Sequence, residues 1–64
     1  MELYEEAIEH YLNALDADET NASAHNAASI SYFMLKKYDM ARKHANIAKQ
    51  LGFKVDKELV KRLK

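Results

Sequence analysis

The stretch YEEAIEHYLNA at residues 4–14 returns as YDMARKHANIA at residues 38–48, and this recurrence decides the fold. Four residues keep their identity at a spacing of 34. The recurring pairs are Tyr4 and Tyr38, Ala7 and Ala41, His10 and His44, and Ala14 and Ala48. A period in the low thirties is typical of two-helix repeats that stack on copies of themselves. Such repeats usually serve as binding scaffolds, so the sequence predicts an architecture more sharply than a partner.

The composition favours a single small helical domain. The chain has 64 residues, one Gly and no Pro or Cys, which excludes disulfides and thiolate metal sites. A chain this short is only marginally stable alone, so we expect good helix packing or association with another chain. No apolar run approaches the ~18 residues that cross a bilayer, and the acidic N-terminal stretch is unlike a signal peptide. We therefore expect a cytoplasmic protein without membrane contact.

Charge divides the chain into two halves of opposite sign, although the formal net charge is zero. Residues 1–35 carry seven carboxylates and no Lys or Arg, for a charge of −7. Residues 36–64 carry ten Lys and Arg against three carboxylates, for a charge of +7. Two solvated faces that differ in sign would explain this division. The alternative is an acidic end that pairs with a basic end, within the fold or between molecules.

The apolar spacing predicts an all-α fold with three main helices and a short fourth. The predicted helices cover residues 3–17, 22–36, 38–51 and 57–63. The first three are antiparallel and should pack around Tyr11, Leu15, Ala28, Tyr32, Ala41 and Ala45. Thr20 or Asn21 can cap the start of the second helix, and Asp56 the start of the fourth. Gly52 supplies the left-handed residue that ends the third helix.

The residues of this pattern resemble the tetratricopeptide repeat family. That repeat reads W-x2-L-G-x2-Y, then A-x3-F, then A and P, over 34 residues. Tyr32 matches the Tyr of its first helix and Tyr38 the aromatic that opens its second helix. Ala41 and Ala48 match the two alanines. The family Trp is replaced by His25, which we interpret as an isolated packing substitute.

The resemblance divides the chain into three parts. Residues 22–54 look like one full repeat, and residues 1–21 look like the second helix of a partial preceding repeat, whose first helix is missing. Residues 55–64 look like the family's C-terminal capping helix. The resemblance implies antiparallel hairpins from a right-handed superhelical stack. The incomplete front repeat favours self-association as a homodimer.

The sequence contains no convincing catalytic or metal site. The three histidines lack the i, i+4 spacing of a helical zinc site, and His10 and His44 correspond through the repeat. Glu5, Glu6 and Glu9 occupy the polar face of the first helix with no candidate nucleophile beside them. We therefore expect that the protein is not an enzyme, that it has no catalytic residues, and that it binds no metal or cofactor.

The second helix has a second apolar face, which is the predicted partner-binding site. Its residues are Ser23, Asn26, Ile30, Phe33 and Met34. The first helices of tetratricopeptide repeats line the concave surface, so the resemblance implies a non-catalytic protein–protein interaction module, a scaffold or adaptor. An apolar strip with a polar end suits an amphipathic helix or an extended apolar peptide.

Two alternatives remain open. The basic segment 54–64 predicts a binder of nucleic acid or an anionic surface. Its charged residues are Lys54, Lys57, Lys61, Arg62 and Lys64. A solubilising cap explains the same charges, because this segment lacks interleaved aromatic residues and a recognition-helix motif. The second alternative is a structural tail of a longer repeat array with no binding role of its own.

Overall fold

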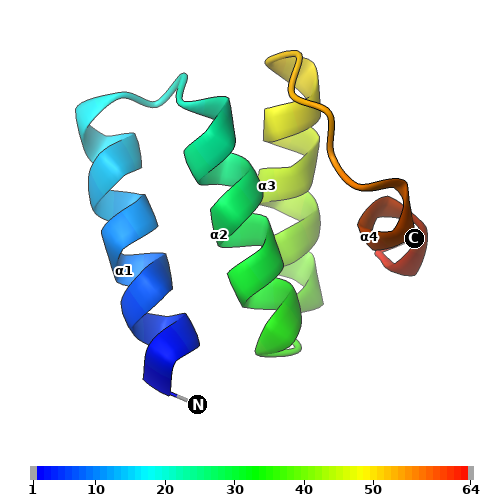
Figure 1. Ribbon diagram of the computed structural model, residues 1–64, viewed down its shortest axis with the longest axis horizontal. Coiled ribbons are helices and arrows are strands. Elements are labelled where there is room, and N and C mark those ends of the chain that lie inside the picture. Colours follow the sequence, from blue (N-terminus) through cyan, green and yellow to red (C-terminus); the bar gives the residue numbers. More distant parts are fainter. Residues whose placement is uncertain (1, 64) are drawn as a thin grey trace.

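The computed structural model describes residues 2–63, and over that range helices joined by short connections are the only regular secondary structure (Figure 1). The four helices are α1 (Glu2–Ala17), α2 (Ala22–Met34), α3 (Tyr38–Gln50) and α4 (Lys57–Arg62). Successive long helices run antiparallel, and α1 and α4 lie at opposite ends of the molecule with α2 and α3 between them (Figure 1). None of the helices within residues 2–63 combines the length and apolar character needed to cross a membrane. The all-α prediction is confirmed.

The core lies between α2 and α3 and extends to α1 and α4. Its buried cluster is Ile8, Ala28, Tyr32, Ala41, Ala45, Leu59 and Leu63. The predicted core is confirmed, because Leu15 is also buried and Tyr11 packs against the cluster. Small residues let the helices approach closely: Ser29 has no exposed surface, and its Oγ donates a hydrogen bond to the Ala41 carbonyl at 2.9 Å. Leu59 and Leu63 make the short last helix part of the core.

Side-chain caps fix the starts of two helices. The Oδ1 of Asn21 accepts from the backbone N–H of Ala24 at 3.1 Å, so Asn21 is the N-cap of α2. Thr20 instead donates its hydroxyl to Asp18 at 2.6 Å, and this hydrogen bond lowers the pKa of the Asp18 carboxyl. The predicted cap of α4 is confirmed, because the Oδ1 of Asp56 accepts from the N–H of Glu58 at 3.0 Å.

The C-terminal ends of α2 and α3 share the Schellman hydrogen-bond pattern, in which the chain turns through a left-handed residue. After α3 that residue is Gly52, with φ 89°, as predicted. The N–H of Phe53 then bonds to the carbonyl of Ala48 at 3.0 Å. After α2 the left-handed residue is Lys36, with φ 63°, and the N–H of Lys37 bonds to the carbonyl of Tyr32 at 2.9 Å.

The prediction that the second helix reaches residue 36 is therefore wrong. The helix ends at Met34 because Lys36 leaves the helical region of the backbone. A left-handed turn normally has a Gly, and a Lys in this place gives no signal in the sequence. The remaining helix boundaries agree with the predictions to within one residue.

Candidate functional site

The five residues predicted to bind a partner lie along one side of α2, at spacings of three and four residues. Ser23 is exposed, and the side chains of Ile30 and Met34 are 43% and 49% exposed. These three residues form the open part of the face. Asn26 and Phe33 are half-buried at its edge. We call this surface, from Ser23 to Met34, the α2 face.

Phe33 belongs partly to the fold. Its ring packs against the core cluster and lies 5.5 Å from the ring of Tyr38, measured between centroids. The Oδ1 atom of Asn26 is buried and has no hydrogen-bond partner within the described residues. Any contribution of Phe33 to binding is therefore mixed with a contribution to stability, and Ile30 and Met34 are the cleaner probes of the face.

The α2 face continues onto α4 through a shallow groove of about 250 Å³. The groove is lined by Ile30, Phe33, Asp56, Glu58, Leu59 and Arg62. Arg62 and Glu58 form an exposed ion pair at 3.9 Å. A ligand on the α2 face therefore meets apolar side chains first and charged side chains of both signs at the edge next to α4.

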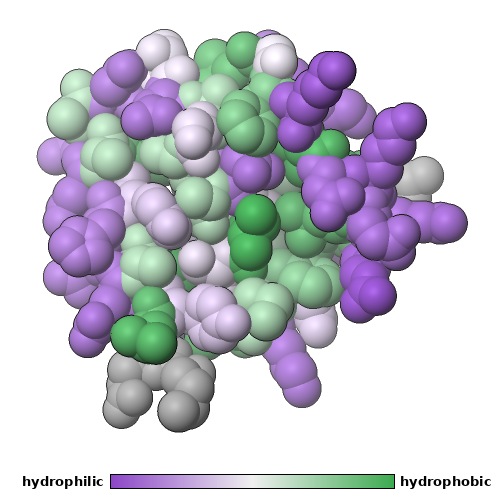
Figure 2. Space-filling view, viewed as in Figure 1, coloured by the Kyte–Doolittle hydropathy of each residue, from purple (hydrophilic) through white to green (hydrophobic). Residues whose placement is uncertain are grey.

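A larger groove lies between the C-terminal end of α3, the connection after it and α4, with a volume of about 730 Å³. It is lined by Lys49, Phe53, Lys54, Val55, Lys57, Val60 and Lys61. We call it the lysine groove, because four lysines surround three half-buried apolar side chains and no carboxylate lines it. Hydrophilic side chains gather around more apolar ones at this end of the molecule in Figure 2.

The basic residues predicted to act together are divided by the structure. Lys54, Lys57 and Lys61 line the lysine groove, whereas Arg62 lines the groove next to the α2 face. Lys64 lies outside the described residues. Sequence reasoning missed Lys49 and the apolar floor, because these come from two elements that only the fold brings together. The i, i+4 spacing of Lys57 and Lys61 places both on one side of α4, and it was the sequence signal available for that wall of the groove.

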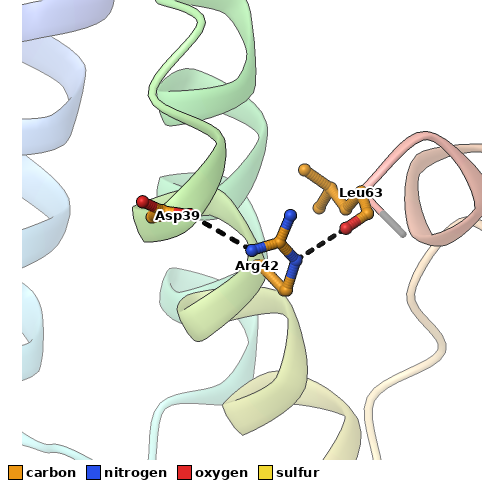
Figure 3. A network of polar contacts seen from close by, with 3 residues as sticks. All are labelled: Asp39, Arg42 and Leu63. Atoms are coloured by element: carbon orange, nitrogen blue, oxygen red, sulfur yellow. Dashed lines mark hydrogen bonds and ion pairs between the residues drawn. The ribbon is translucent and has the colours of Figure 1, made fainter.

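Arg42 attaches α4 to α3. Its Nε donates to the backbone carbonyl of Leu63 at 2.6 Å, and its Nη1 donates to Asp39 at 3.2 Å (Figure 3). The bond to Leu63 satisfies a carbonyl at the end of a helix that has no partner within the helix. Together with the burial of Leu59 and Leu63, this contact holds α4 as the wall between the two grooves.

The interpretation of His25 as an isolated residue is wrong, because it forms a buried pair with His44. The two Nδ1 atoms are 3.0 Å apart, and the Nε2 of His25 lies 2.9 Å from the carbonyl oxygen of Glu19. That carbonyl can only accept, so His25 donates from Nε2 and accepts at Nδ1 from the N–H of His44. The His44 ring also stacks on Tyr32, with 5.5 Å between the ring centroids.

This geometry excludes protonation of both rings at once, because two protonated Nδ1 atoms would leave no acceptor between them. Burial lowers the pKa of His44, and the nearby His25 and Lys43 lower it further. Sequence reasoning missed the pair because the two residues are on different helices and 19 positions apart. Within residues 2–63 there is no cluster of three or more His, Cys, Asp or Glu side chains that could hold a metal ion.

Comparisons with known proteins give no relative from which a function can be transferred. No protein family, no curated protein and no solved structure matches the chain. The likeness to tetratricopeptide repeats therefore remains a prediction from the residues that carry it. Any functional conclusion has to come from the surfaces described above.

Proposed function

We propose that this chain is a non-catalytic protein–protein interaction module of the tetratricopeptide type, and that a partner binds on the α2 face. The observation that carries the proposal is the exposure of Ile30 and Met34, two large apolar side chains on one side of a well-packed helix. Contiguous exposed apolar surface on a small domain is typical of an interaction site. The antiparallel order of α1, α2 and α3 supports the repeat type.

The chemistry of the face suits an amphipathic helix or an extended apolar peptide. Ile30 offers a rigid branched side chain, and the unbranched Met34 can adapt its shape to the partner. Ser23 makes one end of the face polar, while Arg62 and Glu58 line the groove at its α4 edge. The partner should therefore present apolar side chains at its centre and polar ones at its ends.

The test uses a peptide selected from a display library against the unmodified chain. We expect Ile30→Ala/Met34→Ala to weaken binding of that peptide at least ~10-fold, which corresponds to ~1.4 kcal/mol. The melting temperature should change little, because both side chains are already half exposed. The matched control is Leu3→Ala/Met40→Ala, which removes exposed apolar surface elsewhere and should leave the affinity unchanged. Selected peptides that bind the Ile30/Met34 variant normally would refute the proposal.

The predicted alternative, a binder of nucleic acid or an anionic surface, is supported by the lysine groove. Its signature is a steep loss of affinity with rising salt, because phosphate binding releases counterions. Peptide binding on the α2 face should change little with salt. A chain that selects no peptide and binds a random duplex tightly at ~150 mM salt would favour the alternative. A chain that binds neither would favour a purely structural role.

A further inference from the structure

We propose that the lysine groove is a docking site for the acidic side of α1 from a second copy of this chain, so that copies associate head to tail. The inference goes beyond the proposed function, because it concerns a different surface and stands without the α2 face. It rests on three observations: the composition of the groove, the composition of α1, and their placement at opposite ends of one molecule.

The groove is built for an occupant that is both anionic and apolar. Phe53, Val55 and Val60 form an apolar floor that is still partly open to solvent. The ion pairs of the described residues join Arg42 to Asp39 and Arg62 to Glu58, so within residues 2–63 no lysine of the groove has a carboxylate partner. Carboxylates brought among these ammonium groups would relieve their mutual repulsion. A bare phosphate would leave the apolar floor uncovered.

The outer side of α1 has the matching composition. Glu5, Glu9, Leu12 and Asp16 follow one another at spacings of four, three and four residues. They therefore form one stripe along the helix, and all four are exposed. Leu12 is 42% exposed between carboxylates on both sides. The stripe is about 16 Å long at 1.5 Å per residue. It presents one apolar side chain to the floor of the groove and three carboxylates to the lysines.

The fold prevents a chain from filling its own groove. The helices α2 and α3 separate α1 from α4, which places the acidic stripe and the lysine groove at opposite ends of the molecule (Figure 1). The contact is therefore heterologous: one copy supplies its stripe and the next its groove. A dimer formed in this way keeps a free stripe at one end and a free groove at the other. Further copies can add, so the assembly is open rather than a closed dimer.

The size of the end faces sets the strength of this contact. The molecule measures 27 × 27 × 15 Å, and such an end face is smaller than the roughly 800 Å² per partner that stable complexes bury. We therefore expect weak association that depends on protein concentration and decreases as salt screens the charges. Sedimentation equilibrium from ~10 μM to ~1 mM protein, at ~20 and ~500 mM NaCl, measures both dependences.

Two variants, in which neutral amides replace charged side chains, each remove one side of the contact. Glu5→Gln/Glu9→Gln/Asp16→Asn removes the charge of the stripe, and Lys54→Gln/Lys57→Gln/Lys61→Gln removes most of the charge of the groove. We expect the unmodified chain to grow in average mass beyond a dimer at ~20 mM NaCl. Each variant alone should associate at least ~10-fold more weakly. Mixed, they should form a one-to-one complex and stop there, because only one intact stripe meets one intact groove.

The controls distinguish this inference from the proposed function. Lys36→Gln/Lys37→Gln/Lys43→Gln removes three exposed lysines outside the groove and should associate like the unmodified chain. Ile30→Ala/Met34→Ala should also associate normally, even if it no longer binds a peptide. A chain that stays monomeric at ~1 mM and ~20 mM NaCl would overturn the inference, as would a dimer that forms equally well in both charge variants. Tight binding of a random DNA duplex at ~150 mM NaCl by a monomeric chain would overturn it in favour of an anionic polymer.

Discussion

The helices α1 and α3 carry the same Tyr-Ala-His-Ala pattern, 34 residues apart, and the Ala and His residues of the pattern are more deeply buried in α3. Ala41 in α3 has no exposed surface and His44 is only 6% exposed, whereas Ala7 is half-buried and His10 is exposed. The reason is the neighbours of each helix. The residues of α3 pack against α2 and share a core cluster with Leu59 and Leu63, while α1 lies at an end of the molecule and contributes Ile8 to that cluster. A repeat pattern specifies a helix and its apolar face, and the neighbours determine how much that face stabilises the protein.

The largest expected effect concerns the difference in burial between Ala41 and Ala7, which occupy equivalent positions of the repeat. Ala41→Leu adds three heavy atoms where there is no exposed surface, and we expect it to lower the free energy of unfolding by about 2–3 kcal/mol. Ala7→Leu makes the same chemical change in α1 and should cost less than about 1 kcal/mol. Leu and Ala have similar helix propensities, so the difference between the variants reports packing. Urea unfolding measures both, and equal losses would show that the two positions are packed alike.

The same comparison shows which features the sequence could predict. The positions of the helices, the core residues Tyr32 and Ala45, and the cap Asp56 follow from local spacing and side-chain chemistry, and all are confirmed. The pairing of His25 with His44 and the floor of the lysine groove depend on residues from separate elements. The left-handed Lys36 opposes the preference of its own residue type. The histidine pair and the groove floor arise from tertiary packing, which no local pattern encodes.

The second contrast between α1 and α3 is between the exposed His10 and the buried His44, which are equivalent in the repeat. The buried histidine predicts that stability depends on pH. The pKa of His44 in the folded chain lies below its ordinary value of 6.5, so the unfolded chain binds more protons. Stability is therefore complete above pH ~6.5 and is lost as pH falls through the folded pKa. The slope is at most ~1.4 kcal/mol per pH unit for one proton. Urea midpoints at pH 7.5, 6.5, 5.5 and 4.5 measure this loss.

Matched variants assign the loss to the buried histidine. His44→Asn keeps a polar group near the position of Nδ1 and should flatten the profile between pH 7.5 and 4.5. His10→Asn changes the equivalent exposed residue and should follow the unmodified chain. The hydrogen bonds from Thr20 lower the pKa of Asp18 below its ordinary value of 3.8, so the contribution of Asp18 is lost only at lower pH. An unmodified chain whose midpoint stays constant down to pH 5 would contradict the assignment.

The smallest expected effect concerns the ends of the helices, where α3 again differs from α1. A left-handed Gly52 follows α3, whereas the equivalent residue after α1, Asp18, is not left-handed. The helix between them, α2, ends like α3 but with Lys36 in the left-handed conformation. Such a conformation costs a non-Gly residue about 1 kcal/mol, and Gly avoids this cost.

Lys36→Gly should therefore stabilise the protein, although only slightly. The relieved backbone strain is offset by the larger entropy of Gly in the unfolded chain and by the loss of a cation near the negative end of α2. We expect a net gain of about 0.5 kcal/mol, a rise of a few degrees in melting temperature. Gly52→Ala reverses the change at φ 89°, where no heavy atom beyond the neighbouring residues of the chain lies within 4 Å of the added Cβ, so we expect a conformational loss of about 1 kcal/mol. A lower melting temperature for Lys36→Gly, with the expected loss for Gly52→Ala, would mean that the charge of Lys36 at the end of α2 outweighs its strain.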